Sequence, residues 1–164
     1  MKREYNIYKS KQLGTIYIVS DGEAIVNVEL FEDGWEKLHE QYEMVKSESS
    51  LLQEALHQFD EYFCGKRKQF QLPLKWKGTP FQEKVWTALC DIPYGKTVSY
   101  SEIAEKIGHP KAVRAVGQAN RANELAIIVP CHRVIGKNRA LTGYAGQRTD
   151  VKEALLQMES KYVN

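Results

Sequence analysis

Hydrophobic and polar positions alternate over parts of the first thirty residues, which is the pattern of β-strands. Residues 5–8 and 15–19 carry β-branched and aromatic side chains, and residues 24–30 alternate most clearly toward their end. Asp21 and Gly22 separate the last two of these segments, and both tolerate positive φ, so they favour a hairpin turn. The beginning of the chain is therefore predicted to be rich in strands.

A helical period replaces the alternation over residues 51–63. Apolar residues recur there at the spacing of one helix face, at Leu51, Leu52, Ala55, Leu56, Phe59, Tyr62 and Phe63. Gly65 ends this helix. The polar residues 33–50 predict a loop with some helix, and residues 70–74 form a candidate further strand. Residues 76–80 then have the composition of a linker.

Short helices are predicted from residue 80 onward. One apolar helix face comprises Phe81, Val85, Trp86 and Leu89. Ser99 followed by Glu102 has the spacing of a capping box, which satisfies free amide groups at a helix start. The helix that begins there is predicted to end at Gly108.

A second helix is predicted from Pro110, a residue suited to the first helical position, to about Asn120, with Val113 and Val116 facing inward. Two short helices around a glycine form a helix-turn-helix, a common nucleic-acid-binding motif. The small residues of the second helix are Ala112, Ala115, Gly117 and Ala119. They indicate either tight helix packing or close approach to a nucleic-acid groove, with Arg114 and Gln118 as exposed polar arms.

Length and composition bound the class of protein. The 164 residues, 43% hydrophobic and 27% charged, suffice for one domain or two small ones and exclude a disordered chain. The longest uncharged apolar stretch, residues 125–131, is too short to span a membrane, and no secretion signal follows Met1. Free cysteine thiols are typical of proteins in the reducing cytoplasm, which is the predicted location of this chain.

Three cysteines without a CxxC pair exclude a disulfide framework and a four-cysteine zinc site. Cys64 and Cys90 are predicted to lie on apolar helix faces with a structural role. No motif for a nucleotide, a flavin or a metal accompanies the third cysteine, Cys131.

Charge is unevenly distributed although the net charge is only +2. Residues 106–148 contain eight basic residues and one acidic residue, Glu124. This segment is either a solvated basic face or a surface that meets phosphates.

Cys131 lies in the sequence Pro130-Cys131-His132-Arg133, after an apolar run. Neighbouring His and Arg side chains favour a reactive thiolate, whereas a buried structural cysteine is normally inert. Because adjacent side chains of a strand point to opposite sides, the chain must turn at His132 for its ring to reach the thiol. Glu159, on a helix predicted over residues 151–160, is a candidate to orient that ring in a nucleophile–base–orienter relay.

These residues carry a family resemblance. The segment 130–134, preceded by Arg114-Ala115-Val116-Gly117 and followed by Gly143-Tyr144-Ala145-Gly146, closely resembles the O6-alkylguanine-DNA alkyltransferases, also called methylated-DNA–protein-cysteine methyltransferases. The resemblance covers residues 79 to about 160. It implies an α/β (α+β) chain with a ribonuclease-H-like domain at 1–76. A mainly helical DNA-binding and alkyl-acceptor domain with the helix-turn-helix would occupy 79–164.

The resemblance also implies roles for matching residues. Cys131 would accept the alkyl group, His132 would act as its base through a bound water, Glu159 would orient His132, and Asn123 would brace the turn that presents the thiol. Tyr144 would hydrogen-bond the flipped guanine.

Other matching positions would contact DNA. Tyr100 would rotate the 3′ phosphate and protonate the leaving base, and Arg114 would fill the gap left by that base. Relatives also contact the DNA backbone at the positions of Ser101, His109 and Lys137.

The implied activity is direct, irreversible transfer of an alkyl group, mainly methyl, from O6-alkylguanine in double-stranded DNA to Cys131, with one turnover per chain. O4-alkylthymine is a further implied substrate. The chemistry agrees, because thiolate is the best side-chain nucleophile for an alkyl carbon and the O6 atom is reached in line only when the base leaves the stack. The helix-turn-helix would bind the minor groove with little sequence preference. The expected protein is a cytoplasmic monomer that needs no cofactor or metal.

Glu124 departs from the family pattern, since relatives commonly have proline after the asparagine matched to Asn123. Its charge is expected to reduce DNA affinity or to alter the loop. Arg139 and Gln147 stand at positions where relatives commonly have glycine. Both are expected to affect the width of the pocket that takes the alkylated base.

Three other functions compete with this hypothesis. Alkyltransferase-like DNA-binding proteins lack the acceptor cysteine, which Cys131 supplies here. A regulatory alkyltransferase needs an added zinc domain, for which three cysteines are too few. A cysteine hydrolase built on Cys131, His132 and Glu159 needs an oxyanion site that the sequence does not suggest.

Overall fold

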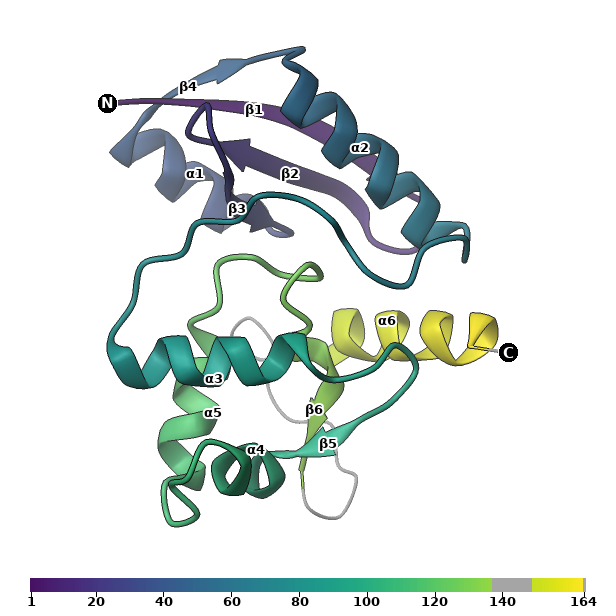
Figure 1. Cartoon of the computed structure of the whole chain (residues 1–164). Coiled ribbons are helices and arrows are strands. Elements are labelled where there is room, and N and C mark those ends of the chain that lie inside the picture. Colours follow the sequence, from purple (N-terminus) through teal and green to yellow (C-terminus); the bar gives the residue numbers. More distant parts are fainter. Residues whose placement is uncertain (137–148, 164) are drawn as a thin grey trace. The chain divides into compact units, whose positions relative to one another are not determined.

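The structure is a computed structural model that describes residues 1–136 and 149–163. Strands dominate its first half and helices its second (Figure 1), which confirms the predicted α+β class. The chain forms two compact units: Met1–Trp76 with Glu124–Ala126, and Lys77–Asn123 with Ile127–Asn164. The inclusion of Glu124–Ala126 in the first unit is a feature that the sequence pattern did not predict.

The first unit is a four-stranded sheet with two helices. The strands are β1 (Lys2–Ser10), β2 (Gly14–Ser20), β3 (Ile25–Glu29) and β4 (Glu43–Lys46), and the helices are α1 (Glu32–Gln41) and α2 (Ser50–Phe63). The strand order is β3-β2-β1-β4, with β1 antiparallel to β2, β2 antiparallel to β3, and β4 parallel to β1. The predicted hairpin turn is present: Gly22 has φ 101° and Asp21 Oδ1 accepts hydrogen bonds from the amides of Glu23 and Ala24.

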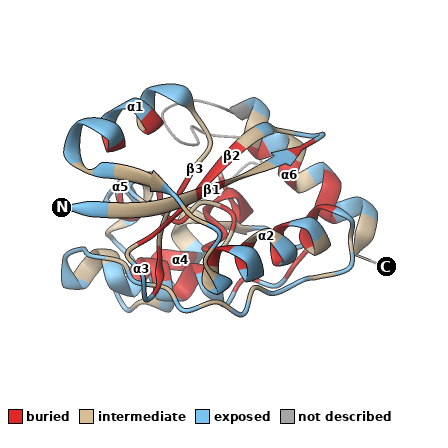
Figure 2. Cartoon of the chain, turned by 90° about the horizontal axis from the view of Figure 1, so that it is seen from above, coloured by how far each residue is buried: buried red, intermediate tan, exposed pale blue. Residues whose placement is uncertain are grey.

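The two helices cover opposite faces of this sheet. Tyr17 of β2 stacks on Trp35 of α1, with ring centroids 4.1 Å apart. Tyr8 of β1, which points to the other face because side chains alternate along a strand, stacks on Phe63 of α2 at 5.5 Å. Figure 2 shows α2 with its buried residues on one side and its exposed residues on the other. The apolar stripe read from residues 51–63 is thus the face that packs on the sheet.

The second unit consists of short helices around a two-stranded parallel pair. Its elements are α3 (Pro80–Cys90), β5 (Val98–Ser99), α4 (Tyr100–Lys106), α5 (Val113–Arg121), the 3-10 turn η1 (Cys131–Arg133), β6 (Val134–Ile135) and α6 (Thr149–Tyr162). Ser99 caps α4 as predicted, since its hydroxyl accepts a hydrogen bond from the Glu102 amide at 3.1 Å. Trp86 of α3 donates from Nε1 to the carbonyl of Ala119 at 2.8 Å and so ties α3 to α5.

The second helix of the helix-turn-helix begins later than predicted. Pro110 lies in the turn, and α5 starts at Val113 because the turn after Gly108 (φ 81°) closes through a hydrogen bond from the Ala112 amide to the His109 carbonyl. Val113 is 37% exposed, so the prediction that it faces inward was wrong. Val116 is fully buried, as predicted.

Two further predictions for the first unit need correction. Residues 33–50, predicted as a loop with some helix, contain most of α1 and also the strand β4, because Trp35 and Leu38 bury an apolar stripe within an otherwise polar sequence. Residues 70–74 do not form a strand, and only Leu74 makes an isolated bridge to Ile25. No helix in the described part of the chain is long and apolar enough to cross a membrane.

Candidate functional site

Cys131 lies at the first position of a tight 3-10 turn. The turn follows Pro130 and is closed by hydrogen bonds from the Cys131 amide to the Val129 carbonyl (2.8 Å) and from the Arg133 amide to the Pro130 carbonyl (3.0 Å). The predicted turn of the chain at His132 is therefore present. Cys131 is only 4% exposed, so its thiol is shielded from bulk water.

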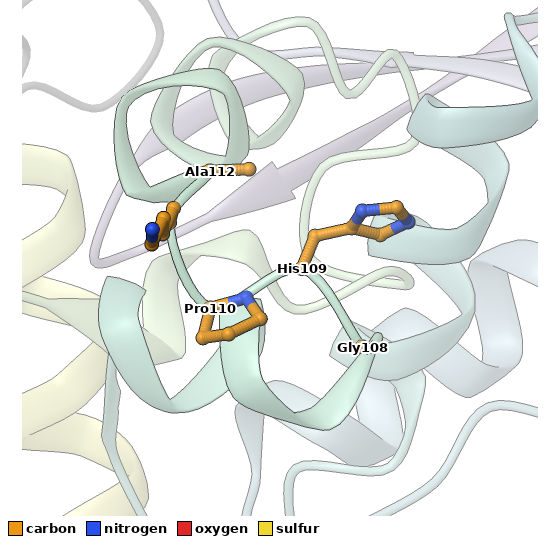
Figure 3. Close-up of a pocket in the computed structure, with 5 residues that line it drawn as sticks. Gly108, His109, Pro110 and Ala112 are labelled. Carbon is orange, nitrogen blue, oxygen red and sulfur yellow. The ribbon is translucent and has the colours of Figure 1, made fainter.

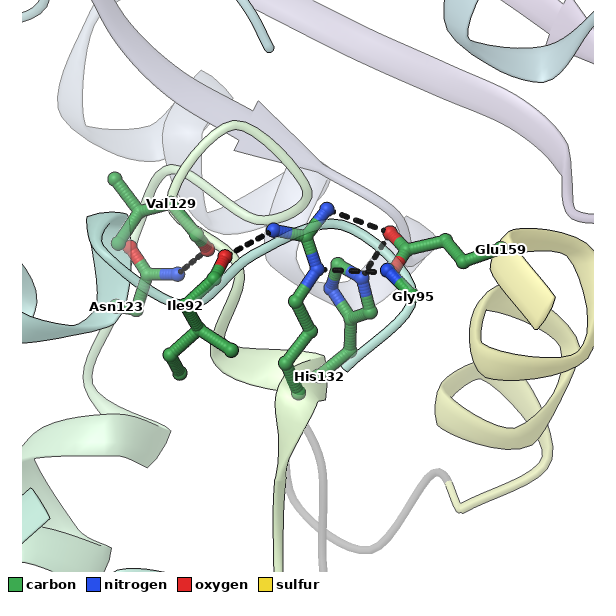
Figure 4. A network of polar contacts seen from close by, with 7 residues as sticks. Ile92, Gly95, Asn123, Val129, His132 and Glu159 are labelled. Atoms are coloured by element: carbon green, nitrogen blue, oxygen red, sulfur yellow. Dashed lines mark hydrogen bonds and ion pairs between the residues drawn. The ribbon is translucent and has the colours of Figure 1, made fainter. Parts of the chain in front are cut away.

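Two asparagine side chains hold this turn. Asn123 donates from Nδ2 to the Val129 carbonyl at 2.9 Å and to Cys131 Sγ at 3.1 Å (Figure 4 draws the first contact). Asn120, on the last turn of α5, donates from Nδ2 to the Cys131 carbonyl at 3.3 Å. The sequence analysis singled out Asn123 but missed Asn120, whose place on the buried face of α5, four residues after Val116, was the available sign.

His132 lies beside Glu159 of α6 in a fully buried pair. His132 Nε2 and Glu159 Oε2 are 2.7 Å apart, and neither side chain is exposed to solvent. Glu159 also accepts two hydrogen bonds from Arg133, Nε to Oε1 at 2.8 Å and Nη2 to Oε2 at 2.9 Å (Figure 4). Such a forked pair fixes both the position and the plane of the carboxylate.

Arg133 is a residue whose place in this network the sequence analysis missed. Its Nη1 donates to the carbonyl of Ile92 at 2.8 Å, so the guanidinium bridges the turn after α3 to α6. The Gly95 amide adds a longer hydrogen bond of 3.3 Å to Glu159 Oε1. The sign in the sequence was an arginine directly after Cys131 and His132 within an apolar run, because a buried arginine needs a carboxylate partner.

Burial and hydrogen bonding set the charges of this group. Burial lowers the pKa of His132, and the hydrogen bond to Glu159 opposes this only partly. Burial alone would raise the pKa of Glu159, but hydrogen bonds and charge from His132 and Arg133 hold it well below its usual range. The carboxylate is therefore ionised, and it faces the Nε2 side of a neutral ring. In that state Nε2 carries the hydrogen and Nδ1 is the acceptor nitrogen.

Lys152 is a third residue whose place in the site was not predicted from the sequence. Its side chain is completely buried, and within the described residues Nζ has no hydrogen-bond partner. Nζ lies 5.7 Å from the centre of the Tyr100 ring. Burial lowers the pKa of Lys152 to about 8, and the charge of Cys131 acts in the opposite direction. The site thus places a cationic group where it favours a thiolate over a thiol.

The helix-turn-helix presents a mostly polar exposed face. Arg114 and Gln118 lie exposed on α5, and His109 is exposed in the turn, where its ring packs edge-on against Phe81. Gly108, His109, Pro110, Lys111 and Ala112 line an open hollow at this turn (Figure 3). Ser101, near the start of α4, is half-buried, and its hydroxyl oxygen lies 3.1 Å from the hydroxyl oxygen of Ser99.

The structure therefore brings Cys131, His132, Glu159 and Asn123 together. Tyr100 lies near this group, because the centre of its ring is 5.7 Å from Lys152 Nζ. Ser101, His109 and Arg114 lie apart from them, on the helix-turn-helix. Tyr144, Lys137, Arg139 and Gln147 lie outside the described residues, as does the segment 143–146.

The two other cysteines differ from their prediction. Cys64 and Cys90 are exposed, whereas Cys131 is buried. Each stands at the end of its helix, Cys64 as the cap of α2 and Cys90 as the last residue of α3, where the apolar stripe no longer faces the core. The prediction that both lie on apolar helix faces was therefore wrong. Within the described residues, no three His, Cys, Asp or Glu side chains gather as a metal site.

Comparison with protein families finds two models that together span most of the chain. Residues 80–161 match the DNA-binding domain of 6-O-methylguanine DNA methyltransferase. Residues 4–76 match the ribonuclease-like domain of the same proteins.

Individual relatives agree with these models. The constitutive methylated-DNA–protein-cysteine methyltransferase of Bacillus subtilis is 53% identical over 148 residues, which cover 90% of each chain. The crystal structure of the O6-methylguanine methyltransferase of Mycobacterium tuberculosis is similar with a TM-score of 0.87 and 40% identity, covering 98% of this chain and 94% of that one. A second structure, the Mycobacterium tuberculosis protein in complex with DNA, gives a TM-score of 0.85 at 38% identity over 99% and 94% of the two chains.

Proposed function

The chain belongs to the 6-O-methylguanine DNA methyltransferase family, and on that premise we propose that it repairs DNA by transferring the alkyl group of O6-alkylguanine to its own Cys131. The protein is a methylated-DNA–protein-cysteine methyltransferase that acts once per chain. Its partner is double-stranded DNA that carries the alkylated base.

The observation that carries this assignment is the environment of the Cys131 sulfur. Sγ receives a hydrogen bond from Asn123, and the adjacent His132 ring is held by a buried carboxylate. Hydrogen-bond donors and nearby positive charge lower a thiol pKa, while an oriented imidazole accepts its proton. This arrangement serves a nucleophile and has no use in a purely structural cysteine.

The reaction is a displacement at the alkyl carbon. His132 takes the thiol proton at Nδ1 through a water, and Glu159 stabilises the imidazolium that results. The thiolate attacks the methyl carbon, the S–C bond forms, and the C–O6 bond breaks with its electron pair remaining on guanine. Tyr100 supplies the proton that the leaving base takes up. The Cys131 thioether is the final state of the protein.

The exposed helix-turn-helix face supplies the DNA contacts. Arg114 fills the space that the flipped base leaves in the stack, and small residues on α5 let the helix approach the minor groove. Contacts to the DNA backbone come from Ser101, His109 and Lys137, and Tyr144 hydrogen-bonds the flipped base. Because these contacts go to backbone and shape, the protein accepts a lesion in any sequence context.

The protein acts as a monomer without a metal or organic cofactor, in the cytoplasm. Three free cysteines in the described residues fit a reducing compartment. One flipped base and one acceptor thiol make a complete reaction within a single chain.

Single turnover is the test of this function. With excess methylated duplex, product is expected to plateau at about one equivalent per active chain, because a thioether is stable in water and the thiol is consumed in the reaction. The measurement is methyl transfer from radiolabelled duplex at several protein concentrations. Product that keeps rising past one equivalent would identify a turnover enzyme such as a hydrolase, and no labelling would identify a non-catalytic DNA-binding protein.

Substitution of Arg114 tests base flipping. Arg114→Ala is expected to slow repair of a well-paired duplex about tenfold while leaving reaction with free O6-methylguanine within about twofold, because only the duplex has a stack to fill. The matched control is Arg121→Ala, an exposed arginine at the end of the same helix, which weakens duplex binding through charge alone. Equal losses on duplex and free base in Arg114→Ala would contradict the proposed role.

A further inference from the structure

The segment Glu124–Ala126 lies beside β3 of the first unit and forms one isolated parallel bridge with it. The Val28 amide donates to the Glu124 carbonyl at 2.9 Å, and Val28 pairs with Leu125 in parallel register. Leu125 is 1% exposed, so its apolar side chain is removed from water. The segment is thus held on β3 by backbone pairing and by burial.

A side-chain pair adds to this anchoring. Asn27 of β3 donates from Nδ2 to Glu124 Oε2 at 2.9 Å, across 97 positions of sequence. Burial and the nearby negative charges of Asp33 and Glu124 raise the pKa of Glu29. The Asn27 amide gives the exposed Glu124 carboxylate a hydrogen-bond donor in this acidic region.

The residues on either side of this segment belong to the site. Asn123, immediately before Glu124, is the residue whose Nδ2 contacts Cys131 Sγ and the Val129 carbonyl. Ile127, immediately after Ala126, has φ 73°, a conformation that costs a β-branched residue about 1–3 kcal/mol. A loop that contains such strain keeps its shape only when its surroundings fix both ends.

We propose that Asn27 and Glu124 are positioning residues for alkyl transfer, because their hydrogen bond holds Glu124–Ala126 on β3 and thereby keeps the Asn123 amide on the Cys131 sulfur. The proposal rests on the proposed function.

The test exchanges the donor and the acceptor of this hydrogen bond. Asn27→Asp places a second carboxylate next to that of Glu124 and removes the donor. Adding Glu124→Gln to this variant restores a hydrogen bond in which the amide and the carboxylate have changed places. A matched control, Gln69→Glu, adds the same charge at an exposed position of the first unit. Each protein is assayed for methyl transfer from duplex DNA, and the pH dependence of Cys131 alkylation by iodoacetamide is followed by peptide mass spectrometry, which separates Cys131 from the exposed Cys64 and Cys90.

Asn27→Asp is expected to raise the apparent pKa of Cys131 alkylation by about half a unit and to slow methyl transfer about threefold or more, because a hydrogen bond to the thiolate favours the charged form. The double variant is expected to return both quantities to within about twofold of the wild type, and Gln69→Glu to leave both unchanged. Every variant keeps the other ionisable side chains around Cys131, which are Lys152, His132, Arg133 and Glu159. Their effect on the apparent pKa of Cys131 is therefore the same in each protein.

Two results would overturn the proposal. One is an Asn27→Asp protein with the wild-type pH profile, whatever its melting temperature, because a merely structural contact changes stability alone. The other is a double variant that remains as impaired as Asn27→Asp. The iodoacetamide profile needs no DNA, so it tests the pair even if the wild-type chain fails to transfer methyl groups, a failure that would instead refute the proposed function.

Discussion

Cys131→Ser is expected to abolish alkyl transfer and to leave affinity for unmodified duplex within about twofold, because a serine hydroxyl is a poor nucleophile at neutral pH. The substitution removes no hydrogen-bond donor from Asn123, whose amide can donate to a hydroxyl oxygen as it does to sulfur. The fold of the turn should therefore persist. Transfer is measured with radiolabelled methylated duplex, and affinity by fluorescence anisotropy.

The control for Cys131→Ser is the pair of exposed cysteines. Cys64→Ser and Cys90→Ser, singly or together, are expected to retain the wild-type rate, because neither side chain is part of the buried network. Residual transfer above a few per cent in Cys131→Ser, or loss of transfer in the control at unchanged stability, would assign the acceptor to another thiol.

Glu159→Gln is expected to produce the second largest effect, on both rate and stability. It leaves Arg133 buried without its carboxylate, and breaking one side of a buried ion pair costs about 3 kcal/mol. It also removes the charge that stabilises a protonated His132, so transfer is expected to slow about tenfold or more. Rates are compared at a temperature where circular dichroism shows both proteins folded.

The pH dependence of this loss follows from the sign of the shift. The pKa of Glu159 is lowered in the folded protein, so its contribution to stability is present above the ordinary glutamate pKa of about 4.3 and declines as pH falls further. The difference in unfolding free energy between the wild type and Glu159→Gln should therefore be largest near neutral pH and narrow in acid. Glu153→Gln, on the exposed side of the same helix, is the matched control and should change neither rate nor stability by a measurable amount. A Glu159→Gln protein with the wild-type rate would remove Glu159 from the mechanism.

Local sequence patterns were sufficient for the elements that depend on local chemistry. The Ser99 cap and the Asp21–Gly22 turn follow from residue types at fixed spacing, and both are present. The turn at His132, which was expected because the ring must bend back toward Cys131, is also present. The contact between His132 and Glu159 spans 27 residues, and the family resemblance rather than any local spacing paired them.

Features that depend on tertiary packing were not predictable in the same way. Arg133 and Lys152 look like surface residues by type, and only the packing of α6 around η1 buries them. The bond between Asn27 and Glu124 joins a strand to a distant loop, and no periodicity connects those positions. Cys64 and Cys90 continue apolar stripes in sequence, but each stands where its helix leaves the core.

The intact mass of the protein after incubation with methylated duplex decides whether Cys131 is the alkyl acceptor. We expect a single addition of about 14 Da, the mass of one methylene, on the peptide that contains Cys131 and on no other. The addition should remain at one per chain with any excess of substrate. An unchanged mass, or an addition mapped to Cys64 or Cys90, would contradict it.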